Sequence, residues 1–219
     1  MRSWIPPLLT TALALTGAGC ASGPATWPPY DVVPANPEGI PLDDPVVRIE
    51  QQDLRLEVEP LDGPGRHAWL EEHTGATADP FARPGLGERL LTFRVRIAAL
   101  GRGSLHFQPQ NAALYRGQGR APVLPLDYTR VFELLGARSG EPTETPTEEV
   151  RRAMRGVWDS AAAVPAGGSI EGLLIFPAPG EFDPPLVLAL MLVRDSTQVE
   201  RLRVPLAPRV RGDAGPPPP

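Results

Sequence analysis

Four side chains able to bind a metal or donate hydrogen bonds alternate along one short stretch, namely His67, Trp69, Glu71 and His73. In a strand, alternate residues share one face, so imidazole and carboxylate groups there can converge on a metal ion. The outer pair, however, is roughly 20 Å apart along an extended strand, too far to share one ion unless the chain bends back. We therefore predict no metal site, and interpret His67 to Glu72 as an exposed polar strand with Trp69 on the surface as a candidate partner-binding residue.

No other combination of residues indicates catalysis. The chain has three histidines, one cysteine and no lysine, so Schiff-base chemistry is excluded. His106 lies on the polar face of a predicted strand, and the pair Glu148 and Glu149 fits the start of a helix, where acidic residues complement the helix dipole. Serine-nucleophile, zinc-protease and phosphate-loop motifs are missing. We predict a protein without catalytic residues, metal or cofactor. An enzyme built from residues distant in the sequence stays an alternative.

Residues 1–19 have the layout of a secretory signal peptide. Arg2 supplies a positive charge, Leu8 to Ala18 is an uncharged and mostly apolar run, and small residues follow it. The run is about half as long as the roughly 20 apolar residues that a membrane-spanning helix needs. We therefore expect this segment to be removed on export.

The sole cysteine, Cys20, stands at the expected cleavage point. The sequence Gly17-Ala18-Gly19-Cys20 resembles the bacterial lipobox, in which small residues precede a cysteine that becomes lipid-modified and then N-terminal. Gly17 departs from the aliphatic residue usual at that place. The resemblance implies a lipid anchor on Cys20, held because each buried methylene contributes about 0.8 kcal/mol. The alternative is an ordinary signal peptide followed by a free thiol.

The residues that follow Cys20 bear on location and partners. Ala21 and Ser22 lack the aspartate that resembles an inner-membrane retention signal, so we expect the outer membrane, with the domain facing the periplasm or the surface. The net charge of −5 and the lack of a basic cluster exclude a nucleic-acid partner. The predicted partners are the membrane, through the lipid on Cys20, and another envelope protein or polymer.

Composition divides the exported chain into three parts. Residues 20–45 are rich in Pro, Gly, Asn and Asp, which is typical of a semi-rigid linker, here one that carries the lipid. Residues 207–219 end in a run of prolines and predict a disordered tail. Residues 46–206 hold the periodic segments and are the predicted folded domain.

Apolar and polar residues alternate with a period of two through most of residues 46–206. In the clearest segment, Leu91, Phe93, Val95 and Ile97 form the apolar face. The predicted strands cover residues 54–58, 67–72, 91–97, 105–107, 112–115, 169–176, 186–193 and 202–206. Seven or eight short strands with turn signals between them predict an all-β, immunoglobulin-like sandwich.

Residues from about 127 to 161 break this pattern and predict a small helical insertion. Asp127 can cap a first helix through Leu135, and Thr145-Pro146-Thr147-Glu148 is a capping box for a second. The second helix carries one apolar stripe, formed by Val150, Met154, Val157 and Trp158. The stripe either packs against the sandwich or presents Met154 and Trp158 to a partner. We favour packing, because an isolated helix of this length is marginally stable in water.

Three segments are similar to immunoglobulin-like domains of unknown function that occur in bacterial lipoproteins. They are the strand pair from Leu91 to Phe107, the sequence Leu114-Tyr115-Arg116-Gly117, and the run from Gly167 to Pro177 that ends in Phe-Pro. The resemblance implies a fold and an extracytoplasmic setting, and no activity. We predict a membrane-anchored, non-catalytic binding or assembly module of the cell envelope. The alternatives are an envelope hydrolase and a carrier for a lipid or sugar on the same scaffold.

Overall fold

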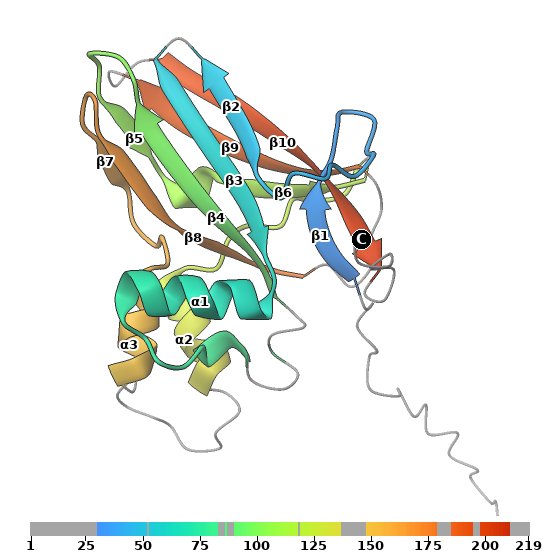
Figure 1. Cartoon of the computed structure of the whole chain (residues 1–219), viewed down its shortest axis with the longest axis vertical. Coiled ribbons are helices and arrows are strands. Elements are labelled where there is room, and N and C mark those ends of the chain that lie inside the picture. The colour runs from blue at the N-terminus through green and yellow to red at the C-terminus, as the bar shows by residue number, and fades with distance from the viewer. Residues whose placement is uncertain are drawn as a thin grey trace, which may run out of the picture.

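The structure, a computed structural model, describes residues 30–51, 53–82, 86, 90–117, 119–136, 148–178, 185–194 and 198–210. Within these residues, strands form two antiparallel sheets that face each other (Figure 1). The strands are β1 (Tyr30–Pro34), β2 (Val47–Gln51), β3 (Leu54–Leu61), β4 (Leu90–Ala99), β5 (Leu105–Phe107), β6 (Ala113–Arg116), β7 (Ala162–Val164), β8 (Ser169–Pro177), β9 (Leu186–Arg194) and β10 (Gln198–Val210). The all-β sandwich is confirmed, with ten strands where seven or eight were predicted.

The chain crosses between the sheets and fills the space between them with apolar side chains. One sheet has the order β1-β10-β9-β5-β7, with β6 also paired to β9, and the other has the order β2-β3-β4-β8. Phe93 on β4 and Phe176 on β8 meet edge to face in this core, with ring centroids 5.7 Å apart. Phe93 is fully buried, whereas Arg94 lies on the outer face of its sheet. The predicted assignment of faces is therefore confirmed.

A helical layer gathers at one end of the sandwich (Figure 1). It consists of α1 (Gly63–Thr74), α2 (Tyr128–Gly136) and α3 (Glu148–Met154), with a short 3₁₀ turn at Pro80–Ala82 (η1). A second 3₁₀ turn, Pro109–Asn111 (η3), connects β5 to β6. Apolar residues of all three helices pack in a second core with Leu173 and Ile175, which lie on the outer face of β8. Among the described residues, no helix has both the length and the apolar character needed to cross a bilayer.

The strand predicted at His67 to Glu72 is wrong, because this stretch belongs to helix α1. Asp62 caps the helix by accepting a hydrogen bond from the backbone N–H of Gly65 at 2.7 Å. Pro64 occupies the first turn, and Gly75 ends the helix with a φ of 69°. The sequence contains these cap residues, but the alternation of polar residues between them predicts a strand instead of a helix.

The predicted limits of the domain are too narrow at both ends. Strand β1 lies inside the predicted linker of residues 20–45, pairs with β10, and buries Val32 and Val33. Strand β10 continues to Val210, inside the predicted tail. It accommodates Pro208 because that residue lies beyond the part of β10 that pairs with β9, and so has a strand on one side only.

The second inserted helix is shorter than predicted. Residues 137–147, which include most of the expected capping box, lie outside the described residues, and α3 ends at Met154. The chain then runs along the edge of β8, where the N–H of Trp158 donates to the carbonyl of Leu173 at 2.9 Å and the N–H of Leu173 donates to the carbonyl of Gly156 at 2.8 Å. The stripe packs on the domain, as favoured, but Trp158 lies on an extended segment and not on the helix.

We expect a chain that begins at Val46 to be less stable than one that begins at Tyr30. The shorter chain loses the burial of Val32 and Val33 and leaves the outer part of β10 unpaired. Each buried valine contributes about 1.5–3 kcal/mol, so the free energy of unfolding should fall by at least about 3 kcal/mol. Urea denaturation followed by circular dichroism measures the difference. Equal midpoints for the two chains would show that β1 adds nothing to the fold.

Candidate functional site

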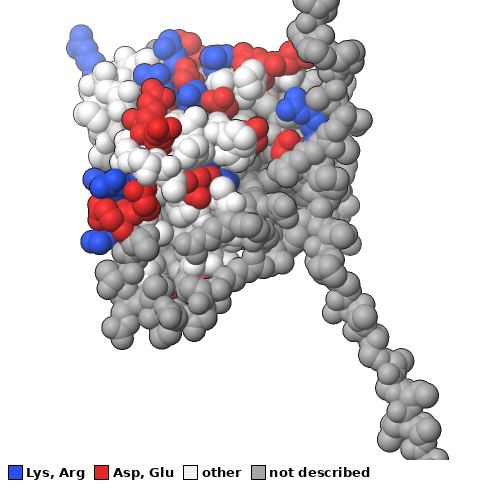
Figure 2. All heavy atoms as spheres, turned by 60° about the horizontal axis from the view of Figure 1, so that its bottom comes forward, with Lys and Arg blue, Asp and Glu red and all other residues white. Residues whose placement is uncertain are grey.

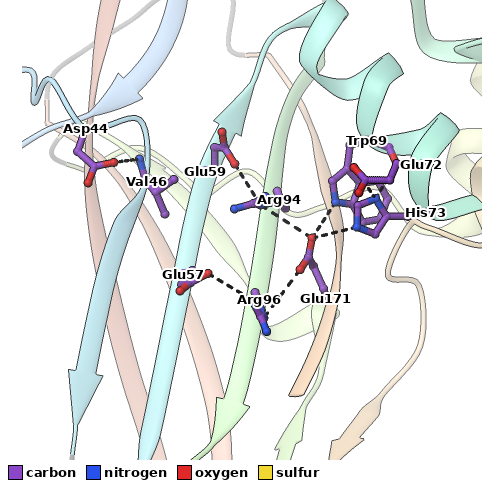
Figure 3. A network of polar contacts seen from close by, with 10 residues as sticks. All are labelled: Asp44, Val46, Glu57, Glu59, Trp69, Glu72, His73, Arg94, Arg96 and Glu171. Carbon is purple, nitrogen blue, oxygen red and sulfur yellow. Dashed lines mark hydrogen bonds and ion pairs between the residues drawn. The ribbon is translucent and has the colours of Figure 1, made fainter. Parts of the chain in front are cut away.

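A network of polar contacts centred on Glu171 joins helix α1 to the outer face of the four-stranded sheet (Figure 3). The indole Nε1–H of Trp69 donates a hydrogen bond to Oε1 of Glu171 at 2.8 Å. The Nε2 atom of His73 lies 3.7 Å from the same oxygen. Glu171 comes from β8, whereas Trp69 and His73 come from α1, so the carboxylate links two elements that are distant in the sequence.

Two arginines of β4 complete the network. Arg94 lies 3.1 Å from a carboxylate oxygen of Glu59 and 3.9 Å from Glu171, and Arg96 lies between Glu57 at 4.0 Å and Glu171 at 3.9 Å (Figure 3). Each arginine thus faces two carboxylates, and positive and negative groups alternate across the strands. Figure 2 shows the same mixing of acidic and basic side chains over the helical end of the molecule. Two arginines lie among three carboxylates, so most of the charge is paired within the network, and its contacts attach helix α1 and strands β3 and β8 to strand β4.

The four residues proposed as a polar face are divided by the helix. Residues four apart share a helix face, so Trp69 lies with His73, while His67 lies with Glu71 on another side. The rings of Trp69 and His73 stack with centroids 4.4 Å apart and planes at 9°. Within the described residues, no three His, Cys, Asp or Glu side chains are close enough to hold a metal ion. Trp69 is only 7% exposed, so its proposed place on the surface as a partner-binding residue is wrong.

A buried ion pair that sequence reasoning missed holds the N-terminal half of α1. The Nε of Arg66 donates to Oδ2 of Asp79 at 2.8 Å, and its Nη1 donates to Oγ1 of Thr92 at 3.2 Å. The guanidinium also lies 5.6 Å from the centre of the Phe81 ring. Arg66 is 2% exposed and is therefore a structural residue of the second core. Its position three residues before Trp69 fits the buried face of the helix, but an arginine does not stand out as a core residue in the sequence.

Two tryptophans rest directly on glycines, and this contact sets how closely the helical layer approaches the sheet. A Cβ atom on Gly156 would lie 2.6 Å from the Trp69 ring, and one on Gly172 would lie 2.3 Å from Nε1 of Trp158. Trp158 also packs on Phe107, with ring centroids 4.7 Å apart. Any larger residue at either glycine would displace a ring.

The other face of Trp158 borders a groove on the surface. Two hollows, of about 360 Å³ and 140 Å³, meet at Trp158 and Asp159. We call them together the Trp158 groove. Its main lining residues are Leu124, Tyr128, Arg130, Arg151, Met154 and Arg155. The two predicted partner-binding residues of the insertion, Met154 and Trp158, are thus brought together here, with Met154 buried at the base.

A third cavity of about 260 Å³ lies where β1 passes the start of α1. Charged side chains contribute much of its wall, among them Asp31, Glu59, Asp62 and Arg209. A carrier for a lipid would be expected to have a preformed apolar cavity. The wall of this cavity is largely polar and charged, so the cavity does not support the alternative of a lipid carrier.

Asp44 lies at the edge of the same region, in the turn before β2 (Figure 3). The backbone N–H of Val46 donates to its Oδ1 at 2.9 Å and lowers the pKa of the carboxyl below its usual value, and the guanidinium of Arg48 lowers it further. Both contacts are exposed, so they fix a local turn and build no site. Cys20, the predicted site of lipid attachment, lies outside the described residues.

Comparisons with known proteins assign the chain to no family. No family model and no curated protein matches the sequence. Among solved structures, the chain is similar to a functionally unknown protein from Listeria monocytogenes, with a TM-score of 0.38 and 12% identity over 83% of this chain and 89% of that one. It is also similar to the yjhA protein of Bacillus subtilis, with a TM-score of 0.30 and 12% identity over 75% and 73% of the two chains. Scores this low carry no argument about function.

We expect Glu171→Ala to destabilise the domain by about 1.5–3 kcal/mol, the usual cost of losing a hydrogen bond to a charged group. The change leaves the indole of Trp69 without its acceptor and removes the carboxylate that Arg94 and Arg96 share. The control is Glu50→Ala, which removes an exposed pair with Arg55 and should cost no more than about 0.5 kcal/mol. Thermal unfolding compares the two, and equal losses would contradict a central role for Glu171.

We also expect Gly172→Ala to destabilise the domain, by about 1–3 kcal/mol, because the added methyl group must push the Trp158 ring off its seat. Gly63→Ala is the matched control, since a Cβ at Gly63 has no atom within 4 Å. Urea denaturation gives the stabilities, and tryptophan fluorescence reports the displacement of the ring. An unchanged spectrum in the Gly172 variant would show that Trp158 does not rest on this glycine.

Proposed function

We propose that the chain is a lipoprotein of the cell envelope, anchored by lipid on Cys20, whose β-sandwich domain binds another envelope component without catalysing a reaction. The observation that carries this proposal is the position of the lipobox-like sequence relative to the fold. Cys20 precedes the first residue of β1, Tyr30, by only ten positions. Ten residues span at most about 35 Å, so a lipid on Cys20 would keep the domain close to the membrane surface.

The connectivity of the strands supports the immunoglobulin-like part of this proposal. Strands β3, β4 and β8 are neighbours in one sheet, and β5, β9 and β10 in the other, with crossovers after β4, β7 and β8. This is the arrangement of strands A, B and E against strands C, F and G in immunoglobulin-like sandwiches. Such sandwiches host many functions, so the binding role is argued from the surface of this chain and not from its fold.

The Trp158 groove supports a binding role. It is an open hollow whose wall includes a half-buried tryptophan and the exposed ring of Tyr128. Aromatic side chains with one covered and one open face are common at the centres of protein interfaces. The outer membrane is the proposed location, because no aspartate follows Cys20.

Replacement of Cys20 tests the anchor. The Cys20→Ala precursor should stay uncleaved after Gly19, should incorporate no radioactive palmitate, and should no longer sediment with membranes. The Ala21→Ser chain is the control, since it keeps the cysteine and should be labelled normally. Labelling of the Cys20→Ala chain at the level of the unaltered protein would end the lipoprotein proposal.

A further inference from the structure

The Trp158 groove has two exposed large apolar side chains in its wall, Leu124 and Tyr128. Leu124 is 49% exposed and Tyr128 is 39% exposed, whereas most large apolar residues among those described are buried. The Tyr128 ring is held in place by a parallel stack on Phe132, with centroids 6.4 Å apart and planes at 3°. An exposed but preordered aromatic ring loses little conformational entropy on binding, which is a property of interface anchors.

The charged residues that line the groove are three arginines and two aspartates, an excess of one positive charge. Arg130, Arg151 and Arg155 line it, against the carboxylates of Asp127 and Asp159. Asp127 is engaged at the start of α2, where its Oδ1 accepts a hydrogen bond from the backbone N–H of Arg130 at 2.8 Å. This excess of arginine stands out in a chain whose net charge is −5.

Two of these arginines form only weak ion pairs with Glu148, at the start of α3. Arg151 lies 3.4 Å from Glu148, and Arg155 lies 3.9 Å from the same residue, with all three side chains more than half exposed. Exposed pairs of this kind contribute little to stability, so the guanidinium groups can exchange Glu148 for a carboxylate of a partner at little cost. Complementary charge of this kind mainly sets the association rate and the choice of partner.

We infer that the Trp158 groove binds an extended acidic segment of a second protein, in which proline or aromatic residues alternate with glutamate or aspartate. The inference rests on the proposed function of a non-catalytic binding module and names its partner. The two hollows share Trp158 and Asp159 in their walls, and two adjoining hollows fit an extended chain better than a compact ligand. Extended proline-rich segments dock in aromatic-lined grooves. Leu124 and Met154 favour apolar side chains over the hydroxyl groups of a glycan.

The test uses the full lipidated chain in detergent micelles and a fluorescent synthetic peptide that alternates proline with glutamate. Fluorescence anisotropy should show saturable binding that weakens as salt is raised. Tyr128→Ala and Arg155→Glu should each weaken binding by about tenfold or more. The matched controls are Tyr115→Ala, a tyrosine outside the groove that is 46% exposed, and Arg201→Glu on β10, and both should bind as the unaltered chain does.

Several results would overturn the inference. They are the lack of saturable binding, equal binding of peptides with glutamine or arginine in place of glutamate, equal losses in the groove and control variants, and binding of an anionic polysaccharide in place of the peptide. Palmitate labelling of the same preparations separates this inference from the proposed function. If the chain is labelled with palmitate but does not bind the peptide, only the inference about the Trp158 groove is refuted. If the chain is not labelled, the proposed lipid anchor is refuted, whether or not the groove binds the peptide.

Discussion

The hydrogen bond from the Trp69 indole to Glu171 is the contact on which the arrangement of the molecule depends. It joins the helical layer to the outer face of a sheet whose other face is already filled by the main core. The helices therefore need their own apolar core, which they build over Leu173 and Ile175. Gly156 and Gly172 allow Trp69 and Trp158 to lie against the backbone where the helical layer meets the sheet. The Trp158 groove lies on the outer side of this contact.

The strands with strict alternation could be predicted from the sequence because one face of each is buried. Strand β4 is the clearest case, since its apolar residues face the core and its arginines face outward. Strand β1 could not be recognised, because it is short and lies in a proline-rich stretch where composition indicates a linker. Its stability comes from pairing with β10, a contact that no local pattern reveals.

Helix α1 was misread for a different physical reason. Its polar residues alternate, and this alternation predicts an exposed strand although Asp62 and Gly75 supply a helix cap at each end. The buried residues Arg66, Trp69 and Leu70 follow helical spacing, but a buried arginine does not register as an apolar position until Asp79 is known to neutralise it. The Glu171 network could not be predicted either, because its members come from four separate elements that only the tertiary structure brings together. The sequence did predict that Trp158 packs on the domain together with Met154. The apolar spacing gave this result even though Trp158 lies beyond the end of α3.

The pairing of β1 with β10 joins the two ends of the domain and so constrains the order in which the chain completes its fold. Among the described strands, β1 comes first in the sequence and β10 comes last, so this edge of the sheet can close only after the whole domain has been made. Pairing between strands so distant in the sequence is slow, because the entropy of closing the long loop opposes it. We therefore expect β1 to dock late in folding. In the proposed lipoprotein, the segment between Cys20 and β1 would reach its final length only at that step.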